Sequence, residues 1–207
     1  MWVKICGTTN MEDAQAAIEA GADALGFIFV PNSPRVVERR EVSEILKVLP
    51  RTVETVGVFA NENSDFLKGL LRLCPFKAIQ FHGEEPPEEV LALKGMARLI
   101  KAIRVKDAES LEQIPLYEGV DAVVLDTYRS DQRGGTGTPF NWELAIRAKE
   151  FGIPVIVAGG LNPTNVADLI RQVQPYGVDV ASGVEISPGR KDQQLVREFV
   201  LRAKSVV

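Results

Sequence analysis

A short apolar run near the start of the chain, VKIC at residues 3–6, ends on a cysteine and is followed by a glycine. Because side chains alternate along a strand, Lys4 and Cys6 share one face, while Val3 and Ile5 share the other. A free thiol has a pKa of about 8.5, and a nearby cation increases the fraction present as thiolate. Cys6 is therefore a candidate reactive group that Lys4 could activate. The alternative is that Cys6 is a small core residue, as free cysteines often are.

A second candidate is Asp126, which ends the apolar run AVVLD at residues 122–126. Burying a carboxylate costs free energy unless it is paired with a charge or used in a reaction. We interpret Asp126 as a general acid or base. The alternative is a structural salt bridge to Lys4 or Lys101.

Two glycine-containing pairs, Gly159-Gly160 and Ser182-Gly183, end two apolar runs late in the chain. Backbone N–H groups in such loops commonly hold a phosphate, helped by the N-terminus of a short helix. Glycine lets the backbone approach the anion closely. Either pair alone could merely serve a tight turn, but both pairs together favour a phosphate site.

Three further features complete the candidate site. Arg35 sits in the loop sequence Ser-Pro-Arg, where its guanidinium could bind a substrate carboxylate or simply be solvated. His82 is the only histidine, and we assign it to substrate binding, with a hydrogen-bonded structural role as the alternative. The glycine-rich segment 133–138 lacks the Gly-Lys-Ser/Thr of a nucleotide-binding loop, so we expect a flap over the site, with Gly135 contacting substrate. The second cysteine, Cys74, is expected in the core.

The elements that must position these side chains recur along the whole chain. Successive β-rich runs start roughly 20 to 33 residues apart, about the size of a βα unit in a barrel of eight. The runs are VKIC (3–6), ALGFIF (24–29), VETVGVF (53–59), AIQFH (78–82), RLIKAIRV (98–105), AVVLD (122–126), PVIVAGG (154–160) and VDVASGV (178–184).

Helix signals separate the runs. Asn10 is expected to cap a helix that ends near Gly21, and Ser64 to cap one that stops before Pro75. The sequence Asn-Pro-Thr at 162–164 is expected to open another helix, which ends near Pro175.

Strands alternating with helices predict a parallel sheet, and eight units without a second domain predict a closed barrel. An open doubly wound sheet is the alternative, but the Gly-x-Gly-x-x-Gly fingerprint is missing after the first strand. We therefore predict an α/β fold, a single-domain (β/α)8 TIM barrel over residues 1–207. In this fold the active site lies at the C-terminal ends of the strands, where the candidates above fall.

Composition excludes several classes of protein. The formal net charge is −4 and the pI about 5.2, without a basic run, so nucleic-acid binding is not expected. No apolar stretch approaches the roughly 20 residues that span a bilayer, and the N-terminus does not resemble a signal peptide. The two cysteines lack metal-ligand spacing, which favours no metal site and a reducing, cytoplasmic location.

Several motifs, taken together in chain order, resemble the phosphoribosylanthranilate isomerase family of tryptophan biosynthesis. They extend from residue 3 to about residue 192. The motifs are VKICGTTN, GADALGFIFVPNSPR, GVF, QFHGEE, LDT, GGTGTPFNW, AGGLNPTNV and VDVASGVE.

The resemblance implies an Amadori rearrangement of N-(5-phosphoribosyl)anthranilate to 1-(2-carboxyphenylamino)-1-deoxyribulose 5-phosphate, without metal or organic cofactor. It assigns the general base to Cys6 and the general acid to Asp126. Arg35 would contact the anthranilate carboxylate, and Asp179 would lie near the sugar hydroxyls. The glycine pairs would hold the phosphate of this sugar substrate. We expect a monomer or a homodimer, with no nucleic-acid or membrane partner.

The chain departs from the family pattern at two positions. Ala181 replaces an expected serine near the phosphate, and Asn141 replaces an expected aspartate, where it can still cap the helix that starts at Trp142. Two other functions remain open from the sequence. A sister barrel of histidine biosynthesis performs the same rearrangement on an aminoimidazole with two aspartates, against which Cys6 argues. The second alternative is a barrel that binds a phosphorylated ligand without turnover.

Overall fold

The computed structural model describes residues 1–127 and 142–206. Within these residues eight parallel strands close into a barrel in chain order, and β1 pairs with both β2 and β8. The strands are β1 (Trp2–Cys6), β2 (Ala24–Ile28), β3 (Glu54–Phe59), β4 (Ala78–Phe81), β5 (Arg98–Val105), β6 (Ala122–Thr127), β7 (Val155–Val157) and β8 (Gly177–Val180). The predicted (β/α)8 barrel is confirmed.

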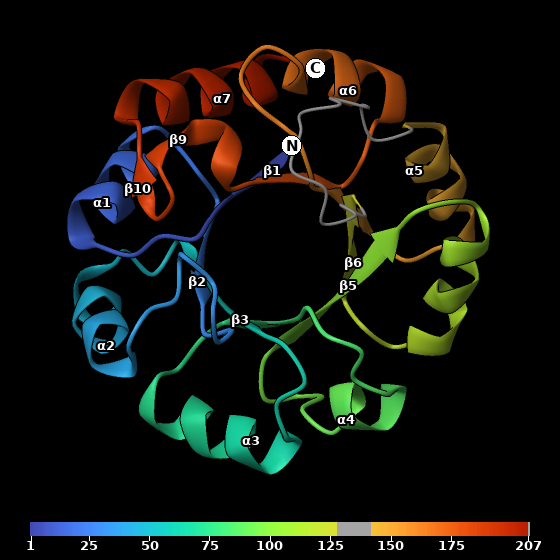
Figure 1. Cartoon of the computed structure of the whole chain (residues 1–207), viewed down its shortest axis with the longest axis horizontal. Helices are drawn as coiled ribbons and strands as arrows, with labels where there is room; N and C mark the ends of the chain where they lie inside the picture. The colour runs from blue at the N-terminus through green and yellow to red at the C-terminus, as the bar shows by residue number, and fades with distance from the viewer. Residues whose placement is uncertain (128–141, 207) are drawn as a thin grey trace.

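Helices surround the strands as an outer ring, as Figure 1 shows. The α-helices are α1 (Met11–Glu19), α2 (Arg39–Val48), α3 (Ser64–Leu73), α4 (Pro87–Leu91), α5 (Trp142–Ala148), α6 (Val166–Val173) and α7 (Gln193–Ser205). Three 3₁₀ segments, η1 (Glu109–Tyr117), η2 (Lys149–Phe151) and η3 (Ser182–Val184), belong to the same described part of the chain. None of the helices in residues 1–127 and 142–206 is long and apolar enough to cross a membrane.

Side-chain alternation along the strands builds two separate apolar layers. Val3 and Ile5 pack in the large layer between the strands and the helices. Cys6 packs in a smaller layer inside the barrel, where alanines such as Ala24 and Ala78 leave room for longer polar side chains. The predicted division of β1 into an inward and an outward face is therefore confirmed.

The last two strands are shorter than the apolar runs suggest. β7 ends at Val157 because Gly159 and Gly160 adopt left-handed φ angles of 80° and 71°, which no strand can include. β8 ends at Val180, and the chain then forms the single turn η3. Apolar character alone did not mark these ends, since alanines and glycines also follow both strands.

The helix caps agree with the sequence in one case and shift in two. Asn10 caps α1, accepting a hydrogen bond from the backbone N–H of Asp13. The cap of α3 is Asn63 rather than Ser64, because the Asn63 side chain accepts from two backbone N–H groups of the first turn. Helix α6 begins at Val166, later than predicted, and the predicted cap Asn141 lies outside the described residues.

A short hairpin that the sequence did not indicate follows β8. It consists of β9 (Glu185–Ser187) and β10 (Arg190–Lys191), paired antiparallel. The Lys191 ammonium donates to the backbone oxygen of Cys6, so the hairpin returns the chain to the C-terminal end of β1. It thereby brings Glu185 and Lys191, which pair with each other, to the end of the barrel where the site is expected.

Candidate active site

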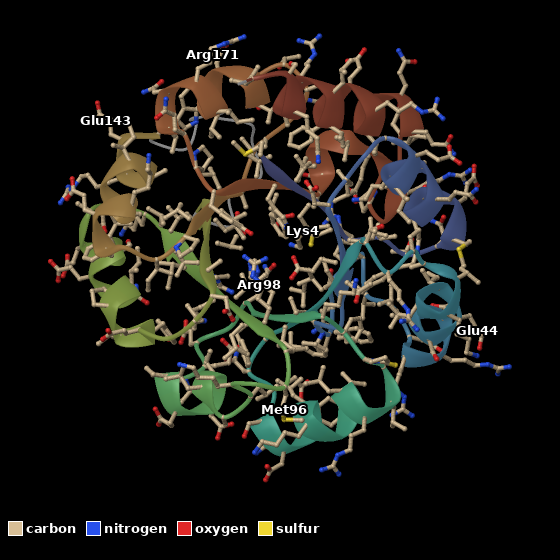
Figure 2. The ribbon with its side chains drawn as sticks, turned by 180° about the vertical axis from the view of Figure 1, so that it is seen from behind. Lys4, Glu44, Met96, Arg98, Glu143 and Arg171 are labelled. Atoms are coloured by element: carbon tan, nitrogen blue, oxygen red, sulfur yellow. The ribbon has the colours of Figure 1, made fainter. Side chains whose placement is uncertain are left out.

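The interior of the barrel contains charged side chains. Figure 2, seen from behind, shows Lys4 and Arg98 near the centre of the barrel, whereas Glu44 and Arg171 lie at the outer edge. Arg98 pairs with Glu54 and lies over the ring of Trp2. Arg98, Glu54 and Trp2 are the first residues of β5, β3 and β1. Their cluster therefore occupies the N-terminal end of the barrel, away from the candidate site.

Lys4 is fully buried and holds two partners from other strands. Its Nζ lies 2.6 Å from Asp179 Oδ2 and donates to Gln80 Oε1 at 2.8 Å. Asp179 is its direct neighbour because Lys4 and Asp179 are partners in the β1–β8 register. Burial alone would lower the pKa of Lys4, but the charge of Asp179 and the neighbouring Cys6 raise it above its ordinary value. Lys4 is therefore an ammonium, and its carboxylate partner is Asp179, so the predicted alternative of a Lys4–Asp126 bridge is wrong.

Cys6 lies at the C-terminal end of β1, beside Lys4. Burial raises the pKa of the Cys6 thiol above its ordinary value, and the positive charge of Lys4 offsets only part of this effect. Gly26 of β2 makes room for both side chains. A Cβ at that position would lie 2.8 Å from Cys6 Sγ and 2.8 Å from Lys4 Cε.

Asp126 lies near the C-terminal end of β6, on the other side of the barrel, and faces His82. The Nε2 of His82 lies 3.3 Å from Asp126 Oδ2, and both side chains are partly exposed, at 27% and 31%. The Nδ1 of His82 lies 2.9 Å from Nε2 of Gln80, the same amide that accepts from Lys4. A continuous line of polar contacts thus joins Asp126 to the lysine beside Cys6.

Lys101 points out of the barrel and does not reach this line. It donates to the backbone oxygen of Gly83 at 2.7 Å and to Glu85 Oε2 at 2.8 Å. Its strand neighbours Leu99 and Ile103 belong to the outer layer, whereas Asp126 points inward, so strand alternation separates the two. The alternative of a Lys101–Asp126 bridge is therefore wrong, and Lys101 instead anchors the loop after β4 that carries His82.

Arg35, in the loop after β2, is held by a residue that the sequence did not single out. Its Nε lies 2.8 Å from Glu185 Oε1 and its NH2 group lies 2.6 Å from Glu185 Oε2. Lys191 also approaches this carboxylate, at 2.9 Å. Burial would raise the pKa of Glu185, but the hydrogen bonds from Arg35 and Lys191 lower it below the ordinary value. Glu185 is therefore a carboxylate that orients Arg35.

The two predicted phosphate-binding pairs lie on touching loops. A Cβ on Gly183 would lie 1.8 Å from the backbone oxygen of Leu161, so the loop after β8 packs directly on the loop after β7. The side chain of Asn165 donates to the backbone oxygen of Gly160 at 3.0 Å, which holds the β7 loop in shape. This arrangement can present backbone N–H groups of two loops to one anion.

Among the predicted site residues, Cys6, Asp179, His82 and Asp126 connect through Lys4 and Gln80, and Arg35 forms a separate cluster with Glu185. Gly135 lies outside the described residues. Gln80 was missed, although a glutamine at the centre of the buried run AIQFH, two residues before His82, was a readable signal. Glu185 and Lys191 had no comparable signal, because their roles depend on the hairpin after β8.

A family model described as N-(5'-phosphoribosyl)anthranilate (PRA) isomerase matches residues 3–202. A curated relative from Geobacter metallireducens, N-(5'-phosphoribosyl)anthranilate isomerase, is 50% identical over 203 residues, covering 98% of each chain.

Solved structures give the same result. The phosphoribosyl anthranilate isomerase of Thermotoga maritima is 38% identical, with a TM-score of 0.92 and coverage of 99% of this chain and 98% of that one. A second isomerase structure, in complex with reduced 1-(o-carboxyphenylamino)-1-deoxyribulose 5-phosphate, is 37% identical with a TM-score of 0.89 and covers 99% and 98%.

Proposed function

Because the chain belongs to the N-(5'-phosphoribosyl)anthranilate isomerase family, and is thus an isomerase of tryptophan biosynthesis, we propose that it works by general acid–base catalysis. The reaction is the Amadori rearrangement of N-(5-phosphoribosyl)anthranilate to 1-(2-carboxyphenylamino)-1-deoxyribulose 5-phosphate. The observation that carries the proposal is the contact line that links Asp126 on β6 to Lys4 beside Cys6 on β1.

Asp126 is the general acid of this proposal. Opening of the furanose requires a proton on the ring oxygen as the C1–O bond breaks and the nitrogen lone pair forms the Schiff base. Asp126 is partly exposed at the end of its strand, so a bound sugar can reach its carboxyl group. Its proton passes to the ring oxygen and leaves a carboxylate.

Cys6 is the general base. After ring opening, the thiolate takes the proton from C2 of the sugar, and the electron pair of that C–H bond moves to give the enolamine. Tautomerisation of the enolamine gives the ketone. Lys4 favours the thiolate by its charge. Assistance of this kind typically contributes about 10²–10⁴ in rate per group.

Binding groups surround the pair. Arg35, oriented by Glu185, is proposed to bind the anthranilate carboxylate, and the loops after β7 and β8 to bind the phosphate. Asp179 has one oxygen on Lys4; its Oδ1 is the buried side-chain polar atom without a hydrogen-bond partner within the described residues. That oxygen is suited to accept a hydrogen bond from a sugar hydroxyl.

The experiment is an assay of the purified protein with freshly prepared phosphoribosylanthranilate, followed by loss of its fluorescence. Turnover by the wild type, together with loss of about 10² or more in kcat for Cys6→Ala and Asp126→Asn, is expected. Cys74→Ala is the matched control, because Cys74 is the other buried thiol and lies in the outer apolar layer. Absence of turnover by the wild type contradicts the reaction, and full turnover by Cys6→Ala contradicts the base.

The remaining assignments belong to the same proposal. The catalytic unit is one barrel over residues 1–207, and we propose a cytoplasmic location. His82 and Gly135 are proposed to contact substrate. The oligomeric state, monomer or homodimer, remains a prediction that size-exclusion chromatography with light scattering would decide.

A further inference from the structure

The contact between Gln80 and His82 has two chemical forms. Their nitrogens lie 2.9 Å apart, and a neutral imidazole carries its proton on either Nδ1 or Nε2. With the proton on Nδ1, Gln80 must present its oxygen to the ring. With the proton on Nε2, Gln80 must present its amide N–H to Nδ1.

Lys4 decides between these two forms. An ammonium only donates hydrogen bonds, and the Nζ of Lys4 lies 2.8 Å from the Gln80 oxygen. Rotating the amide by half a turn would set its NH₂ group against that ammonium, donor against donor, and would remove one of the two acceptors of Lys4, leaving only Asp179. Because Lys4 is fully buried, no solvent replaces the lost partner. The Gln80 oxygen therefore stays on Lys4, and its N–H donates to Nδ1 of His82.

We infer that Gln80 is a positioning residue that holds His82 as the neutral Nε2–H tautomer and thereby controls the hydrogen bond that Asp126 receives. The ring N–H then points at Asp126 Oδ2, 3.3 Å away. A proton on Nδ1 would face the amide N–H of Gln80, so the Nδ1–H tautomer is disfavoured. Asp126 consequently meets the Nε2–H of His82, a neutral donor in this tautomer.

This control matters if Asp126 is the general acid, so the inference rests on the proposed function. An imidazolium beside Asp126 would stabilise the carboxylate and oppose proton donation. A neutral N–H on Oδ2 instead leaves Oδ1 as the oxygen that carries the acidic proton. The line from Asp179 through Lys4, Gln80 and His82 thus sets which hydrogen bond Asp126 receives.

The chain offers a direct test because His82 is its only histidine. In protein labelled with [¹⁵N]histidine, a long-range ¹⁵N–¹H correlation spectrum reports on this one imidazole. It is recorded at pH 8, which is well above the ordinary histidine pKa of about 6.5. The expected wild-type result is an unprotonated Nδ1 and a protonated Nε2. A proton on Nδ1 in the wild type overturns the inference without any variant.

The Gln80→Glu variant separates the effect of Gln80 from the intrinsic preference of the ring. Its carboxylate keeps an acceptor for Lys4 and presents another acceptor to His82, so Nδ1 should become protonated at pH 8. The exposed Gln172→Glu, on α6, is the matched control and should leave Nδ1 unprotonated. An unprotonated Nδ1 in folded Gln80→Glu, with folding checked by circular dichroism, contradicts the inference.

Activity gives a second, independent readout. Gln80→Glu should lower kcat about ten-fold or more while changing KM less, because Gln80 acts on the acid rather than on substrate binding. If Nδ1 becomes protonated but kcat is unchanged, control of the His82 tautomer by Gln80 is supported, and the role of Asp126 in the proposed function is contradicted. The two claims therefore fail separately.

Discussion

The Lys4 ammonium lies 2.6 Å from the Asp179 carboxylate, fully buried inside the barrel, although 175 residues separate the two in the chain. Asp179 is therefore the carboxylate that neutralises Lys4. It also leaves Lys4 beside Cys6 with part of its charge already balanced, which is why burial dominates and the pKa of Cys6 is raised.

Lys4 and Asp179 should move the thiol pKa of Cys6 in opposite directions. Lys4→Met removes a positive charge and should raise the pKa of Cys6, whereas Asp179→Asn removes a negative charge and should lower it. The pH dependence of alkylation by iodoacetamide measures this pKa. A Cys74→Ala background makes Cys6 the sole thiol. Identical profiles for Lys4→Met and the parent would exclude activation by Lys4.

Lys101→Met should destabilise the protein by about 3–5 kcal/mol, because it leaves the buried Glu85 carboxylate without its cation. Lys47→Met removes an exposed i,i+3 partner of Glu44 and should leave the free energy of unfolding nearly unchanged. Urea denaturation monitored by fluorescence compares the two variants. Equal effects would show that the Lys101–Glu85 pair contributes no more than a surface pair.

Gly183→Ala should displace the loop after β8, since its Cβ would collide with the backbone oxygen of Leu161. We expect a loss of about 1–3 kcal/mol in stability and a higher KM, because the phosphate-binding loops no longer meet. Gly69→Ala is the control: it lies in α3 with open space around its Cβ position and should stabilise by about 0.5–1 kcal/mol. A wild-type KM in Gly183→Ala would argue against phosphate binding there.

Stability should fall at acid pH partly through Glu185. Its pKa in the folded protein is lowered, despite burial, by the hydrogen bonds from Arg35 and Lys191. A lowered folded pKa means that the stabilisation is complete above the unfolded value of about 4.3 and is lost as pH falls through the folded value. Glu185→Gln should therefore be less stable at pH 7 and lose less stability between pH 7 and pH 3. Denaturation curves at both pH values measure this difference, and an unchanged acid dependence would contradict the assignment.

Much of the fold could be predicted because strand patterns are local. The eight apolar runs, the inward face of β1 and the cap Asn10 depend on residues close in sequence, and the structure confirms them. The predicted ends of the last two strands were less accurate. Gly159 and Gly160 end β7 through backbone conformation, which hydrophobicity does not report.

The partners of charged residues were predicted less well than the strands. Lys4 and Lys101 were both considered for Asp126, yet each pairs with another carboxylate. Alternation within β5 already directs Lys101 outward, so the Lys101–Asp126 alternative could have been excluded from the sequence. The Arg35–Glu185 pair could not have been predicted in this way, because a short hairpin after β8 brings the two residues together.

By itself, the sequence determined the barrel, the inward placement of Lys4 and Cys6 and the family, because these follow from local periodicity and from motifs in chain order. Only the tertiary structure decided that Asp179 neutralises Lys4, that Glu185 orients Arg35 and that Gln80 joins Lys4 to His82. The physical reason is closure of the sheet. Pairing of β1 with β8 sets Lys4 opposite Asp179, and interior side chains from distant strands then meet across the barrel, where burial favours pairing between polar groups.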